Sequence, residues 1–144
     1  MKKQTVKNTK RPKGNIISNV VNYPVGDFLI RLKNAAVANK HEIVVAKTLL
    51  IYEVAKLLQK SGYIASIKEE MGNLKINLAY IKKEPVLLNI RLISKPGLRI
   101  YKNVKDLEKY KSPSILIIST PKGLMTGSQA LKSNVGGEVI AEIK

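Results

Sequence analysis

The sequence predicts an α+β protein built from two small domains, and three observations lead to that prediction. Between residues 23 and 80, apolar residues recur first at helical spacing and then in strict alternation. After residue 84 the apolar residues mostly alternate, which is typical of strands. The segment 82–85, with two lysines and a proline, is the only plausible linker between these parts. We therefore expect an N-terminal α/β domain at residues 23–83 and a β-rich domain with one short helix at residues 84–144.

The first domain is expected to follow the order α-β-α-β-β. A helix begins near Pro24, because proline suits the first helical turn and Asp27 complements the positive end of the helix dipole. Residues 43–45 form a short strand, and Thr48 is a candidate N-cap for a second helix that stops at Gly62. Strands at residues 63–67 and 74–80 follow, joined by a turn. The apolar residues expected to face the core from the two helices are Val25, Phe28, Leu29, Leu32, Leu50, Ile51, Val54, Leu57 and Leu58.

The second domain is expected to be mostly β. Leu88, Ile90 and Leu92 alternate in a strand, and residues 94–97 form a turn in which proline precedes glycine, as a type II turn prefers. Residues 98–101 continue extended, and a short helix runs through residues 104–108. The most apolar run, residues 115–118, is short and β-branched, so it predicts a buried strand. A final strand covers residues 138–143.

Charge is the most informative property of the composition. The chain of 144 residues has 26 Lys and Arg against 10 Asp and Glu, a net charge of +16, which indicates a polyanionic partner. Residues 1–22 hold six of these positive charges and no acid, which leaves +10 for the rest of the chain. We expect this segment to be a disordered basic tail that becomes ordered on nucleic acid.

Several functional classes find no support in the sequence. The absence of cysteine excludes disulfides and thiolate metal sites. No apolar run approaches the ~20 residues needed to span a bilayer, so a transmembrane segment is excluded, and no membrane is expected among the partners. His41 is the only histidine and lies in a polar segment, and no glycine-rich phosphate fingerprint of the P-loop or dinucleotide type occurs. We therefore expect no enzyme activity, no metal and no cofactor.

The segment 119–126, with sequence STPKGLMT, is a candidate binding loop. It follows the apolar run and brings two hydroxyl residues, a lysine and a glycine to the end of a buried strand. Glycine allows a partner to come close to the backbone, and a following helix start offers free N–H groups to an anion. The alternative is an ordinary strand–turn–helix connection with a helix cap, which for this segment alone is the better supported interpretation.

Two further positions carry polar groups that could contact a partner. If Leu98 and Ile100 face a core, Arg99 and Tyr101 share the opposite face, where a guanidinium beside a phenol ring suits phosphate contact and base stacking. The alternative is a solvated arginine and a tyrosine packed over the sheet edge. Glu138 follows two glycines that allow a tight turn before the last strand. Such a carboxylate could reach a base amino group or orient the segment 119–126.

Four blocks of the sequence together resemble a known family. They are residues 27–35 (DFLIRLKNA), 94–101 (SKPGLRIY), 119–126 (STPKGLMT) and 135–139 (VGGEV). In this order and at these separations, in a basic chain without cysteine, they are similar to the universal family of small-subunit ribosomal proteins of the eighth type. The resemblance covers about residues 23–143.

The resemblance implies a structural protein of the small ribosomal subunit, in the cytoplasm. It would bind the central domain of small-subunit ribosomal RNA directly, at an irregular stem with splayed bases, and help assemble the platform beside neighbouring small-subunit proteins. Some bacterial members also bind their own messenger RNA, and the sequence leaves open whether this one does. The candidate RNA contacts, carried over by resemblance or taken from the patterns above, are Ser119, Thr120, Lys122, Gly123, Thr126, Tyr101, Arg99, Glu138, Arg31 and Asn34.

The chain departs from the usual family pattern at identifiable places. Pro121 stands where another hydroxyl residue is usual, which removes one side chain from contact with a base. Residues 46–49, AKTL, replace the usual Pro-Ser-Ser-Lys, which changes a contact expected from the first domain. The alternatives to a ribosomal role are a basic protein that binds or processes nucleic acid outside the ribosome, and a membrane or chromatin binder that acts through charge alone.

Overall fold

The computed structural model describes residues 23–110 and 114–144, and it confirms the α+β fold class. The basic tail predicted at residues 1–22 lies outside the described residues. The elements in chain order are α1 (Pro24–Val37), β2 (Glu42–Ala46), α2 (Leu49–Lys60), β3 (Ile64–Glu70), β4 (Asn73–Leu78), β5 (Tyr80–Ile81), β6 (Glu84–Pro85), β7 (Ile90–Leu92), β8 (Tyr101–Lys102), α3 (Val104–Lys109), β9 (Ile115–Thr120), β10 (Gly123–Thr126), α4 (Gly127–Lys132) and β11 (Gly137–Ile143).

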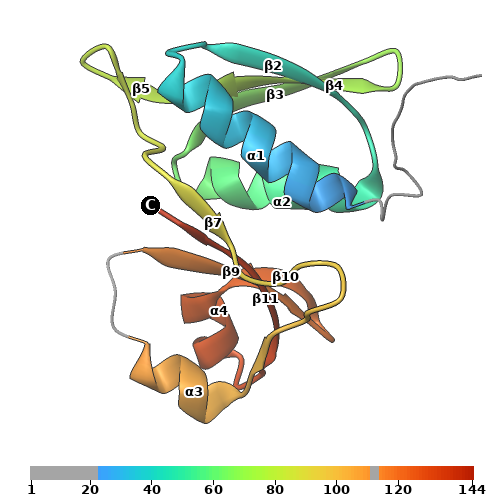
Figure 1. Cartoon of the computed structure of the whole chain (residues 1–144), viewed down its shortest axis with the longest axis vertical. Coiled ribbons are helices and arrows are strands. Elements are labelled where there is room, and N and C mark those ends of the chain that lie inside the picture. Colours follow the sequence, from blue (N-terminus) through green and yellow to red (C-terminus); the bar gives the residue numbers. More distant parts are fainter. Residues whose placement is uncertain (1–22, 111–113) are drawn as a thin grey trace, which may run out of the picture.

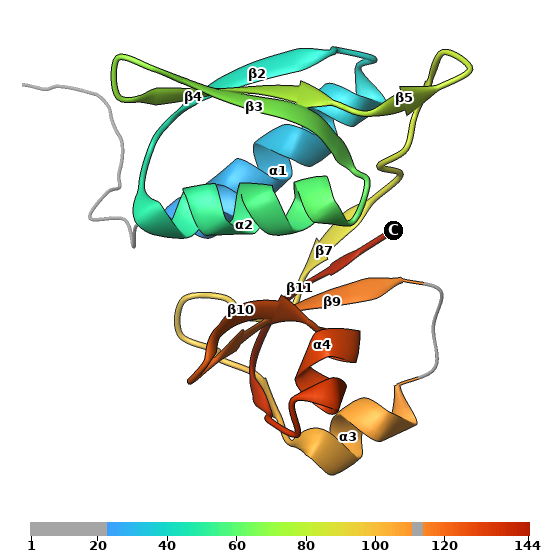
Figure 2. The same ribbon diagram turned by 180° about the vertical axis from the view of Figure 1, so that it is seen from behind.

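The first part of the chain forms a three-stranded antiparallel sheet covered by two helices. Its strand order is β2-β4-β3, and α1 and α2 lie against the same face of the sheet (Figures 1 and 2). The predicted cap of α2 is confirmed, because the Thr48 hydroxyl accepts a hydrogen bond from the Ile51 N–H at 3.1 Å. Leu74, Ile76 and Leu78 alternate toward the helices as buried residues, as their period of two predicts.

The second part forms a five-stranded antiparallel sheet in the order β10-β9-β11-β7, with β8 also paired to β11. In Figure 1, α1 and α2 lie between the two sheets, and α3 and α4 lie beyond the second sheet. Both faces of this sheet are therefore covered near β9. Ile117 belongs to the apolar cluster shared with α1 and α2, whereas Leu116 and Ile118 pack with Ala130 of α4. A strand buried on both faces explains the unbroken apolar run of residues 115–118.

The segment 82–85, predicted as a linker, is the turn and second strand of a small hairpin. β5 and β6 pair with each other, and Lys82 and Lys83 between them have φ angles of 53° and 70°. The larger apolar cluster also extends across this point, since it combines residues of α1 and α2 with Ile140 and Ile143 of β11. The division into two domains at residues 83 and 84 stays our proposal.

Several local predictions were wrong. The second part was expected to have one short helix, and it has two, α3 and α4. Leu50, expected in the core, is 43% exposed; it lies in the first turn of α2 and lines an open cleft. Leu88 is 71% exposed, and the strand that it was expected to begin starts only at Ile90. The segment 119–126 was expected to be a loop between a strand and a helix. It is instead part of a β-hairpin of β9 and β10, and α4 begins after β10.

Candidate nucleic-acid interface

Three of the predicted contact residues lie in a row across neighbouring strands. Glu138 of β11 is paired with Ser119 of β9 on one side and with Tyr101 of β8 on the other. Residues directly opposite each other in antiparallel strands project from the same face of the sheet. Ser119 shares that face with Ile117, two residues earlier, so the row lies on the side of the sheet that is turned toward α1 and α2.

A cleft of about 570 Å³ opens beside this row, where the second sheet meets the starts of α1 and α2. On the side of the second sheet, its wall contains the polar side chains of Ser119, Glu138 and Arg99. At the helix starts, the cleft is lined by Tyr23 and Thr48. The remaining lining residues are Pro24, Val25, Leu50 and Ile140. The cleft thus combines a hydroxyl, a carboxylate and a guanidinium with apolar surface, which is the chemistry that an unstacked base requires.

Arg99 is held between two partners inside the cleft. Its Nη1 lies 3.4 Å from Oε2 of Glu138, whose side chain is only 22% exposed. Its guanidinium carbon lies 5.1 Å from the ring centroid of Tyr23, within cation–π range. Leu98, expected to face a core, is instead 59% exposed because it belongs to the tight turn at residues 95–98. Tyr101 is 67% exposed and does not cover the sheet edge.

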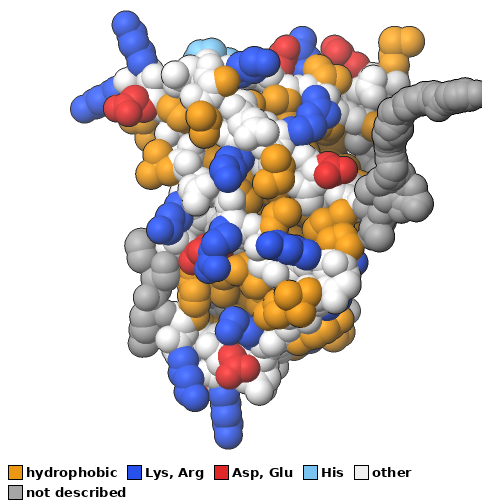
Figure 3. All heavy atoms as spheres, viewed as in Figure 1, with side chains coloured by type: hydrophobic (Ala, Val, Ile, Leu, Met, Phe, Trp, Pro, Cys, Tyr) orange, Lys and Arg blue, Asp and Glu red, His pale blue; other side chains and the backbone are white. Residues whose placement is uncertain are grey.

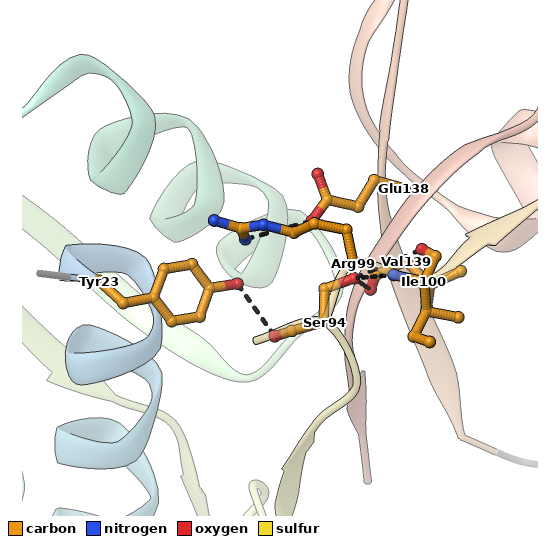
Figure 4. A network of polar contacts seen from close by, with 6 residues as sticks. All are labelled: Tyr23, Ser94, Arg99, Ile100, Glu138 and Val139. Carbon is orange, nitrogen blue, oxygen red and sulfur yellow. Dashed lines mark hydrogen bonds and ion pairs between the residues drawn. The ribbon is translucent and has the colours of Figure 1, made fainter. Parts of the chain in front are cut away.

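A buried serine organises the backbone around these side chains (Figure 4). Ser94 is fully buried, and its hydroxyl donates to the Val139 carbonyl at 2.7 Å while it accepts from the Ile100 N–H at 3.0 Å. The Ser94 carbonyl in turn accepts a hydrogen bond from the Tyr23 hydroxyl at 3.2 Å. Burial raises the pKa of Tyr23 above its usual 10.0, although the nearby Arg99 charge opposes this, so the hydroxyl stays a donor at neutral pH.

The two threonines of the segment 119–126 use their hydroxyls within the protein. Thr120 donates to the Gly123 carbonyl at 2.8 Å and accepts from the Lys122 N–H at 3.1 Å, which fixes the hairpin turn. Thr126 caps α4 by accepting from the Gln129 N–H at 3.2 Å, so the helix-cap alternative holds at this position. Lys122 and Gly123 are exposed at the hairpin tip.

The glycine pair before Glu138 serves close backbone approach and not turn geometry. Neither glycine has a positive φ; the left-handed residue in this connection is Asn134, with φ 56°. A Cβ on Gly136 would lie 2.4 Å from the Lys102 carbonyl oxygen, and one on Gly137 would lie 2.1 Å from the Ser119 carbonyl oxygen. The pair therefore allows β11 to enter between β8 and β9, and this brings Glu138 beside Ser119.

Arg31 and Asn34 are exposed on α1 and are not among the residues that line the cleft. Arg31 donates from Nη2 to the Val44 carbonyl at 2.9 Å, so it satisfies an outward-facing group of the edge strand β2. The structure therefore brings together Ser119, Glu138, Arg99 and Tyr101, and it leaves the two residues of α1 apart from them. Figure 3 shows Lys and Arg side chains spread over this view of the molecule, with few acidic side chains between them.

Sequence reasoning missed Tyr23 and Gly26. Tyr23 supplies one wall of the cleft, and Gly26 leaves room for its ring, because a Cβ there would lie 2.4 Å from Cδ2 of Tyr23. A glycine within an otherwise strong helical pattern is a signal of close packing that could have pointed to this contact.

The described part of the chain shows neither a group of metal-ligating side chains nor a membrane-spanning helix. Within residues 23–110 and 114–144, no three or more His, Cys, Asp or Glu side chains are grouped so that they could hold a metal ion. Of the helices in this part of the chain, none has the length and apolarity to cross a membrane.

A strongly basic chain with a cleft that combines charged groups and apolar surface, on a small α+β scaffold, is typical of nucleic-acid-binding proteins. Residues 23–143 match the family described as Ribosomal protein S8, and the chain belongs to this family. A relative from Flavobacterium johnsoniae, named small ribosomal subunit protein uS8, is 45% identical over 127 residues, which cover 83% of this chain and 96% of the relative. Proteins of the same name from Vesicomyosocius okutanii and Nitratidesulfovibrio vulgaris are 41% and 36% identical, with 83% of this chain covered in each case.

Proposed function

We propose that the protein is a structural component of the small ribosomal subunit that binds ribosomal RNA directly, in the cytoplasm. Membership of the Ribosomal protein S8 family and the name shared by its relatives support this role. We further propose that its site is an irregular stem in the central domain of the small-subunit RNA, and that binding there helps assemble the platform beside neighbouring proteins. Binding to its own messenger RNA would use the same surface.

The observation that carries the proposal is that Ser119 and Glu138 lie directly opposite each other in the wall of the cleft. An A-form duplex hides its major-groove edges, so a sequence-specific protein needs unpaired bases and short polar groups that reach them. A carboxylate accepts hydrogen bonds from base amino groups but repels phosphate, and a hydroxyl can donate or accept. In the cleft, therefore, Glu138 and Ser119 suit a base edge, and Arg99 supplies the compensating charge.

Affinity and selectivity would come from different residues. Lys122 at the exposed hairpin tip, with the other surface lysines, would contact phosphates, which adds affinity without sequence information. Ser119 and Glu138 would distinguish an irregular stem from a regular one. A protein that binds or processes nucleic acid outside the ribosome would lack this distinction or would turn over its RNA.

The test is a gel-shift titration of the full chain with two RNAs at about 50 to 300 mM salt. One RNA is the central-domain stem from the protein's own ribosome, and the other is the same stem with its irregularity repaired to plain duplex. We expect tighter binding to the native stem that persists at high salt. Equal affinities that fall together with salt would leave only charge-driven binding and would reject the proposal.

Three variants separate the two contributions. Ser119→Ala and Glu138→Gln should each remove about one hydrogen bond to the RNA. We therefore expect about five- to tenfold weaker binding to the native stem only. Lys122→Ala serves as the matched control from the same hairpin, and it should weaken binding to both RNAs equally. If all three variants lower both affinities alike, direct reading of bases by this cleft is excluded.

A further inference from the structure

The side chain of Tyr23 contacts Arg99, one of the two charged groups in the wall of the cleft, and Arg99 in turn pairs with Glu138. The tyrosine ring lies under the Arg99 guanidinium, 5.1 Å from ring centroid to guanidinium carbon, and Arg99 also reaches Glu138 at 3.4 Å. Figure 4 shows the three side chains in this order, with the arginine between the ring and the carboxylate. Arg99 lies in the segment just before β8 and Tyr23 at the start of α1, so the stack bridges the two parts of the chain.

The hydroxyl of Tyr23 acts on the backbone beneath the same side chains. It donates to the Ser94 carbonyl, and the Ser94 hydroxyl connects the Ile100 N–H to the Val139 carbonyl. Ile100 follows Arg99 in sequence, and Val139 follows Glu138. The hydrogen bond of Tyr23 is therefore linked through one buried serine to the backbone that bears both charged groups.

The helix itself is shaped to allow this contact. Gly26 lies one turn after Tyr23, and its missing side chain leaves the space that the tyrosine ring fills. A Cβ there would also stand 3.3 Å from Cδ1 of Leu92. Tyr23 occupies the N-cap position of α1 without capping the helix by its side chain, so its polar group is used for the cleft and not for the helix start.

We propose that Tyr23 is a positioning residue that fixes Arg99 and Glu138 in the arrangement that reads an RNA base. An arginine held at one place by two partners loses less freedom on binding than a mobile one. It also compensates the Glu138 charge within the cleft, which limits repulsion between the carboxylate and RNA phosphates. The part that concerns RNA rests on the proposed function, whereas the positioning itself is a property of the free protein.

The first experiment therefore uses the free full-length protein. The NMR chemical shift of the Arg99 side-chain Nε–H is sensitive to the ring of Tyr23, because the guanidinium lies over that ring. Tyr23→Ala should move this signal toward that of a solvated arginine, and Tyr23→Phe, which keeps the ring, should leave it near its wild-type position. An Arg99 signal unchanged in Tyr23→Ala would overturn the proposal, whatever the RNA measurements give.

Tyr80→Ala is the matched control. The Tyr80 hydroxyl also donates to a backbone carbonyl, that of Lys40 at 2.8 Å, and its ring stacks on His41 with 4.1 Å between centroids. Tyr80 thus also combines a hydrogen bond to a backbone carbonyl with a contact of its ring, at a place that is not part of the cleft lining. Its removal should leave the Arg99 signal unchanged. A shift as large as that in Tyr23→Ala would mean that loss of any such tyrosine disturbs the fold, and it would overturn the specific role.

The second experiment measures binding to the native and repaired stems. Tyr23→Ala should lower affinity for the native stem about five- to tenfold and leave the repaired stem unaffected. In the Glu138→Gln background the same substitution should have little further effect, because Tyr23 acts through the charged pair. Losses that simply add would overturn the positioning role in RNA recognition. A wild-type protein without preference for the native stem would reject the proposed function, and the Arg99 signal would still decide the positioning.

Discussion

Ser119 of β9 and Glu138 of β11 are directly opposed in an antiparallel pair, and Gly137 beside them has its Cα against the Ser119 carbonyl. The row of polar side chains therefore depends on a backbone contact that only a residue without a side chain permits. A serine and a glutamate that are 19 positions apart in sequence become neighbours because two glycines precede the glutamate.

Gly137→Ala should destabilise the protein. Its Cβ would lie 2.1 Å from the Ser119 carbonyl oxygen, closer than real contacts allow, so β11 must move away from β9. Overpacking of this kind costs about 1–3 kcal/mol, and we expect the upper part of that range because the obstacle is backbone. Urea unfolding monitored by circular dichroism measures the loss of free energy of unfolding.

The control for this substitution is Gly127→Ala. At that position a Cβ meets Cβ of Leu116 at 3.6 Å, which is ordinary contact, and Gly127 is the first residue of α4. Alanine also favours the helix by about 0.5–1 kcal/mol over glycine. The variant should be as stable as the wild type or slightly more stable. Equal destabilisation of both variants would contradict the close-approach explanation.

Thr120→Val should lower stability and leave selectivity for RNA unchanged. The Thr120 side chain is buried and holds the turn through Gly123 and Lys122, so its loss should cost about 1 kcal/mol of unfolding free energy. Any loss of RNA affinity should be the same for native and repaired stems. Ser119→Ala should give the opposite pattern, with stability kept and selectivity for the native stem lost. If Thr120→Val instead weakened binding to the native stem alone, Thr120 would have to contact the RNA directly.

Removal of residues 1–22 should reduce the salt dependence of RNA binding. The segment holds six positive charges, and each phosphate neutralised adds about 0.7–0.9 to the slope of log affinity against log salt. We therefore expect the slope to fall by at most about four to five. Preference for the native stem should persist. A truncated protein that binds both stems equally would show that this segment contributes to recognition.

The sequence predicted the regular elements well because their signals are local. The cap at Thr48 and the alternation from Leu74 to Leu78 depend on residues close in the chain, and both appear in the structure as expected. The hairpin of β9 and β10 was missed because β10 has only Leu124 and Met125 as apolar residues. Its polar turn has the same composition as a helix start.

The cleft could be predicted only in part. Ser119, Glu138 and Arg99 came from blocks of sequence, and the alignment of β8, β9 and β11 brought them together. The hydrogen bond from Tyr23 to Ser94 joins residues 71 positions apart, and no local pattern indicates such a contact. The exposure of Leu50, which lines the open cleft, is likewise not indicated by its position in the helical pattern.

Glu142 should make the stability of the protein depend on pH in the acid range. Its carboxylate accepts hydrogen bonds from the Tyr110 hydroxyl and from Arg91 Nε, the latter at 3.1 Å. The bond from Tyr110 is the main cause that holds the pKa of Glu142 below its usual 4.5, and the Arg91 charge acts in the same direction. Because the folded-state pKa is depressed, this contribution is present above pH 4.5 and is lost as pH falls through the lower, folded value.

Wild-type protein should therefore exceed Glu142→Gln in unfolding free energy by about 1–2 kcal/mol at neutral pH, and the difference should shrink toward about pH 3. Urea titrations at several pH values measure it. Tyr110→Phe removes the main cause of the shift, so its stability should change less between neutral and acid pH than that of the wild type. A difference between wild type and Glu142→Gln that stays constant over this range would show that the ionised form of Glu142 adds nothing to the fold.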